Sequence, residues 1–319
     1  MDFDFSDEQE QLRDAVRKWV DRGYDFERRR AAVRAGGFER NTYNELADLG
    51  LAGLYIPEEH GGMGMGPVEG MVVMEELGRG IVLEPLGQAL VAGATLAGYA
   101  PDAVKREWLP KIASGEALVV LAHQERKARW RLDRCETQAK QQGDGWIVSG
   151  TKSIVPAGDQ ADAYLVPATA GEKMVMLLVA RSGSGVKASG YTALDGSRAA
   201  EVSFQDAPAT LVSQDGLASL EYAVDIAIAG TCAEGVGAID KTMLLTAEYM
   251  NTRKQFGVPI ASFQALRHRM ADMKMQQELA RSMSYYASLK LNAPADERRR
   301  ALARAKYQLG VAMRFVGQN

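Results

Sequence analysis

The amino-acid sequence predicts a mainly helical α+β protein. Hydrophobic residues recur at helical spacing from residue 1 to about 115 and again from about 214 to 319. Short apolar or alternating runs, separated by glycine- and aspartate-rich turns, fill the stretch between. A chain of 319 residues is long enough for two or three domains. We therefore expect an N-terminal helical domain (1–115), a middle antiparallel β domain (116–213) and a C-terminal helical bundle (214–319).

The helices of the first segment are predicted from capping patterns and apolar periodicity. Ser6 followed by Gln9 has the pattern of a helix cap, and apolar residues at helical spacing come next. Three further helices are predicted over residues 41–50 and 67–78 and from residue 101 onward. The glycine-rich stretch 56–66 is a weak candidate for a phosphate loop, because no strand precedes a βαβ unit there.

The second and third segments are predicted from a change of period. Strands are expected over residues 118–122, 145–148, 163–166, 174–180 and 200–204. Three long helices follow, over residues 217–249, 265–291 and 294–317.

Composition excludes several classes of protein. A net charge near −3 gives no electrostatic case for nucleic acid as a principal partner. Cys135 and Cys232 lack C-x-x-C spacing, which favours reduced thiols in a cytoplasmic protein. The acidic N-terminus is unlike a signal peptide, and no continuous apolar run reaches the roughly 18 residues of a membrane span. The three histidines lack metal-ligand spacing, so no metal site is predicted: His60, His123 and His268.

The segment from Arg253 to Gln264 carries the strongest functional signal. A connection between two helices needs only Gly, Pro and polar residues, yet this one also holds Arg253, Phe256 and Gln264. An arginine can grip a pyrophosphate through two hydrogen bonds, and the helix that begins near Ala261 offers free N–H groups to an anion. The segment is therefore predicted to bind a phosphorylated cofactor.

The same segment closely resembles the R-x-x-F-G-x-x-I-x-x-F-Q signature of the acyl-CoA dehydrogenases, and Pro57–Gly62 resembles their P-E-E-x-G-G loop. The resemblance covers the whole chain and is closest to small subunits of heteromeric enzymes such as pimeloyl-CoA dehydrogenase. In this family the signature loop reaches the FAD of a neighbouring subunit. The resemblance thus implies five cofactor-binding residues: Arg253, Gln255, Phe256, Phe263 and Gln264.

The reaction that the resemblance implies is FAD-dependent α,β-dehydrogenation of an acyl-CoA thioester, with an electron-transferring flavoprotein as acceptor. A glutamate removes the α-proton, at a position that aligns with Ala223 or lies beyond residue 319. Glu221 faces about 200° away along the helix, and Glu234 lies about 16 Å further on. No catalytic residue is therefore predicted in this chain. Family members continue for about fifty more residues, so the last helix of the fold is expected to be missing from this sequence.

The flavin pocket departs from the family pattern. Where the family has T-E-P-G-A-G-S-D, this chain follows His123 and Gln124 with bulky and cationic residues. Where the family has Trp-x-Thr, which stacks on the ring and bonds its N5, this chain has Ile154 and Pro156. Isoleucine cannot stack, and proline has no N–H to donate. These four positions are therefore predicted to form a degenerate flavin pocket, beside a cationic loop that is more consistent with a solvated loop than with a site for CoA phosphates.

An intact loop beside a degenerate pocket predicts a subunit that lends FAD contacts to a catalytic partner and is inactive alone. The partner would be a family member in a homo- or hetero-oligomer, a dimer or tetramer. Two alternatives stay open: a conventional homomeric enzyme with a divergent pocket, and a non-catalytic scaffold, in which Arg253 and Gln264 would be free to change. A nucleic-acid-associated member is disfavoured, because acidic residues flank the arginine runs 28–30 and 298–300.

Overall fold

Helices at both ends of the sequence and strands between them confirm the predicted α+β class. The computed structural model describes residues 5–143 and 145–319. The chain divides into two units, and each unit joins segments that lie far apart in sequence. The first comprises residues 1–26, 67–82 and 228–319, and the second comprises residues 27–66 and 83–227.

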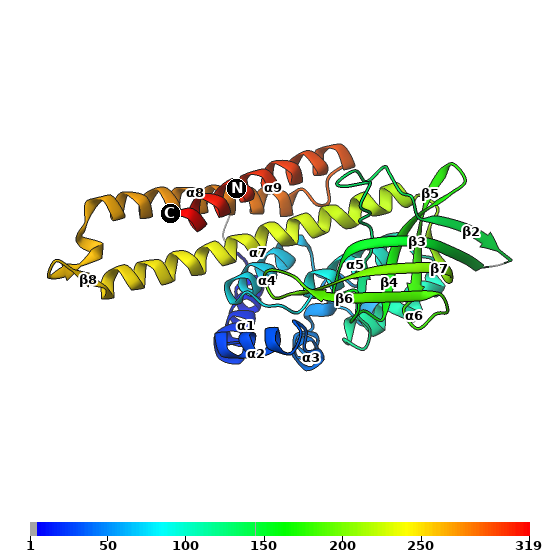
Figure 1. Cartoon of the computed structure of the whole chain (residues 1–319), viewed down its shortest axis with the longest axis horizontal. Coiled ribbons are helices and arrows are strands. Elements are labelled where there is room, and N and C mark those ends of the chain that lie inside the picture. Colours follow the sequence, from blue (N-terminus) through cyan, green and yellow to red (C-terminus); the bar gives the residue numbers. More distant parts are fainter. Residues whose placement is uncertain (1–4, 144) are drawn as a thin grey trace. The chain divides into compact units, whose positions relative to one another are not determined.

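The first unit is helical (Figure 1). Its elements are α1 (Asp7–Gly23), α4 (Pro67–Gly80), the larger part of α7 (Gly216–Thr252), β8 (Lys254–Gln255), β9 (Val258–Pro259), η3 (Ile260–Ser262), α8 (Gln264–Leu289) and α9 (Ala295–Gln318). The predicted cap of α1 is confirmed: the Gln9 N–H donates to Ser6 Oγ at 3.2 Å, and the Ser6 N–H donates to Gln9 Oε1 at 3.0 Å. Two donors that a helix start leaves unpaired are thereby satisfied.

Helices α4 and α7 approach each other closely through glycines. A Cβ atom at Gly78 would overlap the carbonyl oxygen of Glu234, and one at Gly237 would overlap that of Glu75. Only glycine permits such a separation between two backbones. Glu234 therefore lies at a helix crossing.

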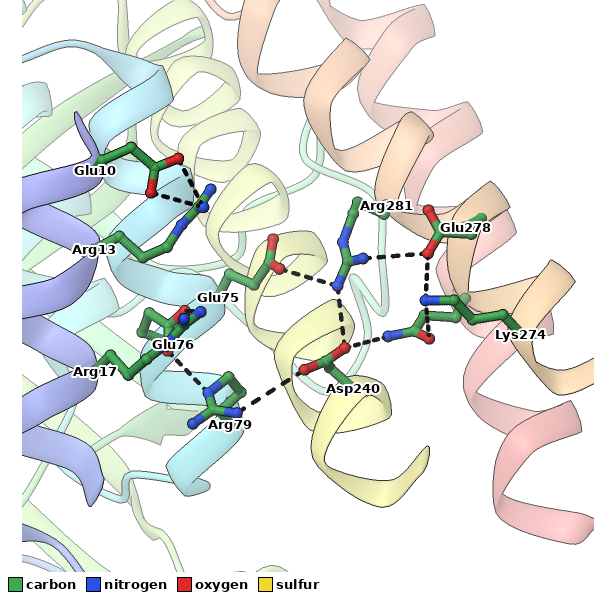
Figure 2. Close-up of polar contacts among 11 residues, drawn as sticks. Glu10, Arg13, Arg17, Glu75, Glu76, Arg79, Asp240, Lys274, Glu278 and Arg281 are labelled. Atoms are coloured by element: carbon green, nitrogen blue, oxygen red, sulfur yellow. Dashed lines mark hydrogen bonds and ion pairs between the residues drawn. The ribbon is translucent and has the colours of Figure 1, made fainter. Parts of the chain in front are cut away.

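A network of charges joins α1, α4, α7 and α8 within the first unit (Figure 2). Glu76 of α4 has a buried side chain and accepts from Arg79 at 2.9 Å and from Arg17 of α1 at 2.6 Å. Arg281 of α8 lies 3.3 Å from both Glu75 of α4 and Asp240 of α7. Arginine forks that serve several carboxylates hold helices in register. The network thus fixes α8 against α7, the two helices that the β8–β9 hairpin connects.

The second unit combines short helices with the sheet. Its helical elements are α2 (Phe26–Arg34), α3 (Arg40–Asp48), η1 (Leu51–Gly53), η2 (Glu58–His60), α5 (Leu86–Tyr99) and α6 (Asp102–Ala113), together with the first residues of α7. Its strands are β1 (Val119–Leu121), β2 (Gln138–Gln142), β3 (Gly145–Pro156), β4 (Ala163–Ala170), β5 (Lys173–Ala180), β6 (Val186–Thr192) and β7 (Arg198–Ser213).

The strand pairings close into a ring. Around the ring, β4 pairs with β2, β2 with β3, β3 with β7, β7 with β5, and β5 with β4. Strand β1 pairs with β4 outside this ring, and β6 pairs with β7. Tyr164 and Phe204 meet edge to face, with ring centres 5.9 Å apart, and both are buried. The prediction of a purely antiparallel domain needs correction, because β1 and β2 each pair with β4 in parallel.

Two strands and two α-helices of the second unit escaped the sequence prediction. Strands β2 and β6 are polar and mostly exposed, so neither shows the alternation of a half-buried strand. Helix α5 is apolar on nearly all sides, and α2 has a weak apolar face with Ala32 alone fully buried. Helical periodicity is faint in both patterns.

Two other sequence features have a structural explanation. In the stretch 56–66, a Cβ atom at Gly62 would overlap the carbonyl oxygen of Ile56, so tight packing accounts for that glycine without a phosphate. Helix α7 contains an 18-residue window apolar enough to cross a membrane by length and composition. Of that window, 56% is buried, as in the core helix of a globular protein.

Candidate cofactor site

The β8–β9 hairpin is a tight turn at the end of α7, as Figure 1 shows. Lys254 pairs with Pro259 and Gln255 with Val258, and the Ile260 N–H donates to the Arg253 carbonyl at 2.8 Å. Phe256 and Gly257 occupy the turn with φ of 52° and 81°. Positive φ at both central residues is the geometry that two-residue hairpins favour, but it is unusual for phenylalanine. The chain accepts this strain at the residue that it presents at the tip.

The side chains of the hairpin, residues 253–258, are exposed. Phe256 is 92% exposed, and its ring meets that of Phe263 edge to face, with ring centres 6.1 Å apart. The exposed side chains of Arg253 and Gln264 make no hydrogen bond or ion pair within residues 5–143 and 145–319. The Gln255 amide donates only to the adjacent carbonyl of Lys254. Four of the predicted cofactor-binding residues are therefore exposed and available to a ligand, namely Arg253, Gln255, Phe256 and Gln264, whereas Phe263 is half-buried.

The four positions of the predicted degenerate pocket lie around the end of β1 and the second half of β3. The backbone N–H of Ser153 donates to the carbonyl of Gln124 at 2.8 Å, which places Gln124 beside Ile154. Ile154 has φ of 53° and is 59% exposed, and Pro156 is exposed at the end of β3. Desolvation, helped by the charge of Lys152, lowers the pKa of His123 to about 4, so this imidazole is neutral at pH 7.

A buried ion pair lies directly beneath this region. Lys152 is fully buried, and its Nζ lies 2.7 Å from Glu125 Oε1 and 2.8 Å from the carbonyl of Pro167. The Glu125 carboxylate also accepts from the backbone N–H groups of Glu136 and Thr137 and from the Thr137 hydroxyl. Burial opposes ionisation of Glu125, but the Lys152 charge and these hydrogen bonds outweigh it and lower the pKa to about 2. The pair therefore ties both ends of the 125–136 loop to β3.

The cavity beside the ion pair of Glu125 and Lys152 is small. A cavity of about 10 Å³ is lined by His123, Gln124, Arg129, Cys135 and Leu220, among others. That volume holds about one water molecule. Ile154 and Pro156 lie outside this lining, and the Pro156 nitrogen has no N–H to donate to a flavin ring. Ile154 and Pro156 offer a flavin neither an aromatic ring to stack on nor an N–H, whereas the exposed side chains of Arg253 and Gln264 suit the phosphates of such a cofactor.

The cationic loop is solvated and satisfied by its own chain. Arg126 pairs with Glu201 at 2.8 Å, and Arg131 donates to Asp133 through Nε at 3.0 Å and through Nη2 at 2.7 Å. Trp130 at its tip is 86% exposed. This arrangement agrees with the solvated-loop interpretation, because carboxylates of the chain already occupy these cations.

Sequence reasoning missed the pair of Glu125 and Lys152. The available signal was Lys152 next to Ser153 and Val155 in a strand that otherwise reads as half-buried. A lysine facing inward in such a strand indicates a buried partner. The partner lies 27 residues away, so no local pattern identifies it.

Comparison with known proteins then decides the family. Residues 6–116 match the model of the acyl-CoA dehydrogenase N-terminal domain, and residues 214–319 match that of the acyl-CoA dehydrogenase C-terminal domain. The chain belongs to the acyl-CoA dehydrogenase family. This family is FAD-dependent and comprises oxidoreductases that act on CH–CH donors.

Individual relatives agree with this assignment. The probable acyl-CoA dehydrogenase YngJ of Bacillus subtilis is 28% identical over 306 residues, which cover 89% of this chain and 79% of that protein. Among solved structures, a variant of the Tcur3481-Tcur3483 steroid acyl-CoA dehydrogenase is 27% identical with a TM-score of 0.89, covering 97% of this chain and 84% of that one. The ChsE4-ChsE5 complex of Mycobacterium tuberculosis is 26% identical with a TM-score of 0.87, covering 99% and 88%.

Proposed function

We propose that this chain is the subunit of an acyl-CoA dehydrogenase that lends contacts to the FAD of a catalytic partner and binds no FAD in its own pocket. The observation that carries the proposal is the exposed hairpin. Phe256 is 92% exposed at a strained turn, and Arg253 makes no ion pair within the described residues. A side chain that the fold strains and leaves in water indicates a role in recognition.

The chemistry of the hairpin suits the pyrophosphate end of a dinucleotide. The Arg253 guanidinium can donate two parallel hydrogen bonds to phosphate oxygens. Gln264, the first residue of α8, adds an amide donor near the free N–H groups of a 26-residue helix. Phe256 and Phe263 supply apolar surface that would exclude water from these contacts. When bound, FAD supplies the acceptor for the hydride of the dehydrogenation.

Neither glutamate near the expected base position is assigned a catalytic role in this proposal. Glu234 lies on α7 where Gly78 packs against its backbone, which supports a role in helix packing. Glu221 lies one turn before the buried Asp225, near the start of α7. The α-proton base would then come from the partner subunit.

The proposed partner is a family member that carries its own flavin pocket and base. Two of the similar solved structures are named for pairs of gene products, Tcur3481-Tcur3483 and ChsE4-ChsE5, which supports a heteromer. The substrate would be an acyl-CoA, the electron acceptor an electron-transferring flavoprotein, and the location the cytoplasm. The same proposal includes the resemblance to the small subunit of pimeloyl-CoA dehydrogenase. It also includes the division of the chain into three domains, with boundaries at residues 115 and 213.

The stoichiometry of FAD in the native enzyme tests the proposal. The tagged chain would be isolated with its partner from the producing cells, and FAD and each polypeptide would be quantified. We expect FAD in an amount that matches the partner chains alone. One FAD for every subunit in a complex made only of this chain would instead establish the conventional homomer. A complex without FAD would establish the scaffold.

A further inference from the structure

The second unit contains an open cavity that the proposed function does not use. It has a volume of about 650 Å³ and lies between the end of α6, the loop that follows α6, and the ends of β4 and β5. Its walls include Trp108, Lys111, Glu116, Asp162 and Arg181. A cavity of this size is in the range that holds a drug-sized ligand.

The two cations of this cavity are at most weakly paired with acidic groups. The exposed Arg181 guanidinium makes no hydrogen bond or ion pair to any residue that the structure describes, and the Arg181 backbone is held by its N–H donating to the Asp162 carbonyl at 2.9 Å. Lys111 Nζ has Glu107 as its nearest carboxylate, at 4.0 Å. The Asp162 carboxylate is already engaged, by Arg40 at 2.9 Å and by the Leu118 N–H at 2.7 Å. The cavity therefore offers Arg181, which has no acidic partner among the described residues, and Lys111, whose ion pair with Glu107 is long.

An aromatic wall and a free carboxylate complete the cavity. Trp108 is half-buried, and Lys111 Nζ lies over its ring, 5.4 Å from the ring centre. Its indole N–H donates no hydrogen bond within residues 5–143 and 145–319. Glu116 is exposed and makes no ion pair among those same residues. The cavity thus combines an aromatic surface, an acceptor and two cations.

We propose that this cavity binds a nucleoside diphosphate. The phosphates would lie on Arg181 and Lys111, because these cations hold phosphate oxygens through charge-assisted hydrogen bonds. The ribose hydroxyls would donate to Glu116, as an acidic residue does in many dinucleotide sites. The base would lie against Trp108, whose ring gives apolar contact and whose N–H gives a donor.

A simpler ligand matches fewer of these features. An inorganic phosphate would use the two cations and leave Trp108 and most of the 650 Å³ without a role. A divalent cation is disfavoured, because no group of three or more His, Cys, Asp or Glu residues able to hold one occurs in the described parts of the chain. A nucleoside diphosphate has a phosphate, a ribose and a base, and it would therefore use the cations, Glu116 and Trp108 together.

Calorimetric titration of the full-length chain with ADP tests this assignment. We expect one ADP for each chain, with adenosine and pyrophosphate each competing more weakly than ADP. Arg181→Gln and Lys111→Gln should each weaken ADP binding by about tenfold through loss of a charge-assisted contact. Arg106→Gln, a change at an exposed residue of the same helix outside the cavity, should leave the affinity within about twofold.

A second pair of variants separates this cavity from the hairpin. Trp108→Leu should weaken ADP binding, and Arg253→Ala should leave it unchanged. Because Arg181 and Lys111 lie at the surface rather than in the core, their variants keep the test decisive if the Trp108 variant folds poorly. Absence of saturable binding at millimolar ADP would overturn the proposal. So would equal affinity in the wild type and Arg181→Gln, or loss of binding in Arg253→Ala.

Discussion

The β8–β9 hairpin and the 125–136 loop both contain arginine and an exposed aromatic residue, but they differ in whether the arginines are paired with carboxylates of the same chain. In the hairpin, the Arg253 side chain makes no hydrogen bond or ion pair with the residues that the structure describes, and Phe256 is exposed at a strained turn. In the 125–136 loop, Arg126 and Arg131 are paired with carboxylates of the same chain. A buried pair beneath that loop also holds its backbone.

The difference indicates which of the two segments is available to bind a ligand. Side chains whose interactions are satisfied internally stabilise a fold, whereas side chains left unsatisfied and exposed are available to something outside it. By this criterion we expect the hairpin to bind the cofactor and the 125–136 loop to stabilise the fold.

Removal of Lys152 should have the largest effect on stability. Lys152→Met leaves the buried Glu125 carboxylate without its cation, and breaking one side of a buried pair costs about 3–5 kcal/mol. Urea unfolding followed by circular dichroism measures the loss. The control is Arg126→Gln, which breaks the exposed pair with Glu201 and should cost under about 1 kcal/mol. Equal losses in the two variants would mean that the loop is not held from beneath.

Removal of Arg253 should have the largest effect on the cofactor. In the assembled enzyme, Arg253→Ala should weaken FAD binding by about 1.5–3 kcal/mol, or roughly ten- to a hundredfold. Arg131→Ala is the matched control, because Arg131 is equally charged but pairs with Asp133 in solvent, and its loss should cost within about 0.5 kcal/mol. Dissociation constants for FAD measured by fluorescence compare the two. Identical values would remove the distinction between the hairpin and the loop.

Acid should weaken the scaffold before it affects the hairpin contacts. The pKa of Glu125 is about 2 in the folded chain and about 4.3 in an unfolded one, so its ionisation stabilises the fold above the unfolded value. This contribution is lost as the pH falls from about 5 toward 2. We expect the stability difference between the wild type and Glu125→Gln to shrink over that range in urea titrations. A difference that stays constant from pH 6 to pH 3 would contradict the assigned charge.

The smallest expected effect is that of the two glutamates on α7. Glu221→Gln and Glu234→Gln should leave flavin reduction by acyl-CoA in the assembled enzyme nearly unchanged for each folded site. Loss of a true general base would cost about 10² to 10⁴ in rate. Single-turnover kinetics on complexes with verified FAD content make the comparison. A hundredfold drop in either variant would place catalysis in this chain.

Sequence reasoning predicted the long elements because periodicity and caps are local properties. Helices α7, α8 and α9 were located to within a few residues, and the Ser6 cap was confirmed. Polar strand β6 and the parallel pairing of β1 with β4 were missed, because exposure and strand order depend on distant segments. The pairing of Lys152 with Glu125 and the cavity lined by Trp108 and Arg181 were missed for the same reason.

The flavin content of this chain purified alone tests the central claim most directly. The account predicts a colourless protein with little or no FAD and no acyl-CoA dehydrogenase activity, even after incubation with free FAD. The visible absorbance of bound flavin and the FAD released on denaturation measure this outcome. A yellow, stoichiometrically flavinylated and active homomer would contradict the account, because it would show that the pocket beside Ile154 and Pro156 still holds the cofactor.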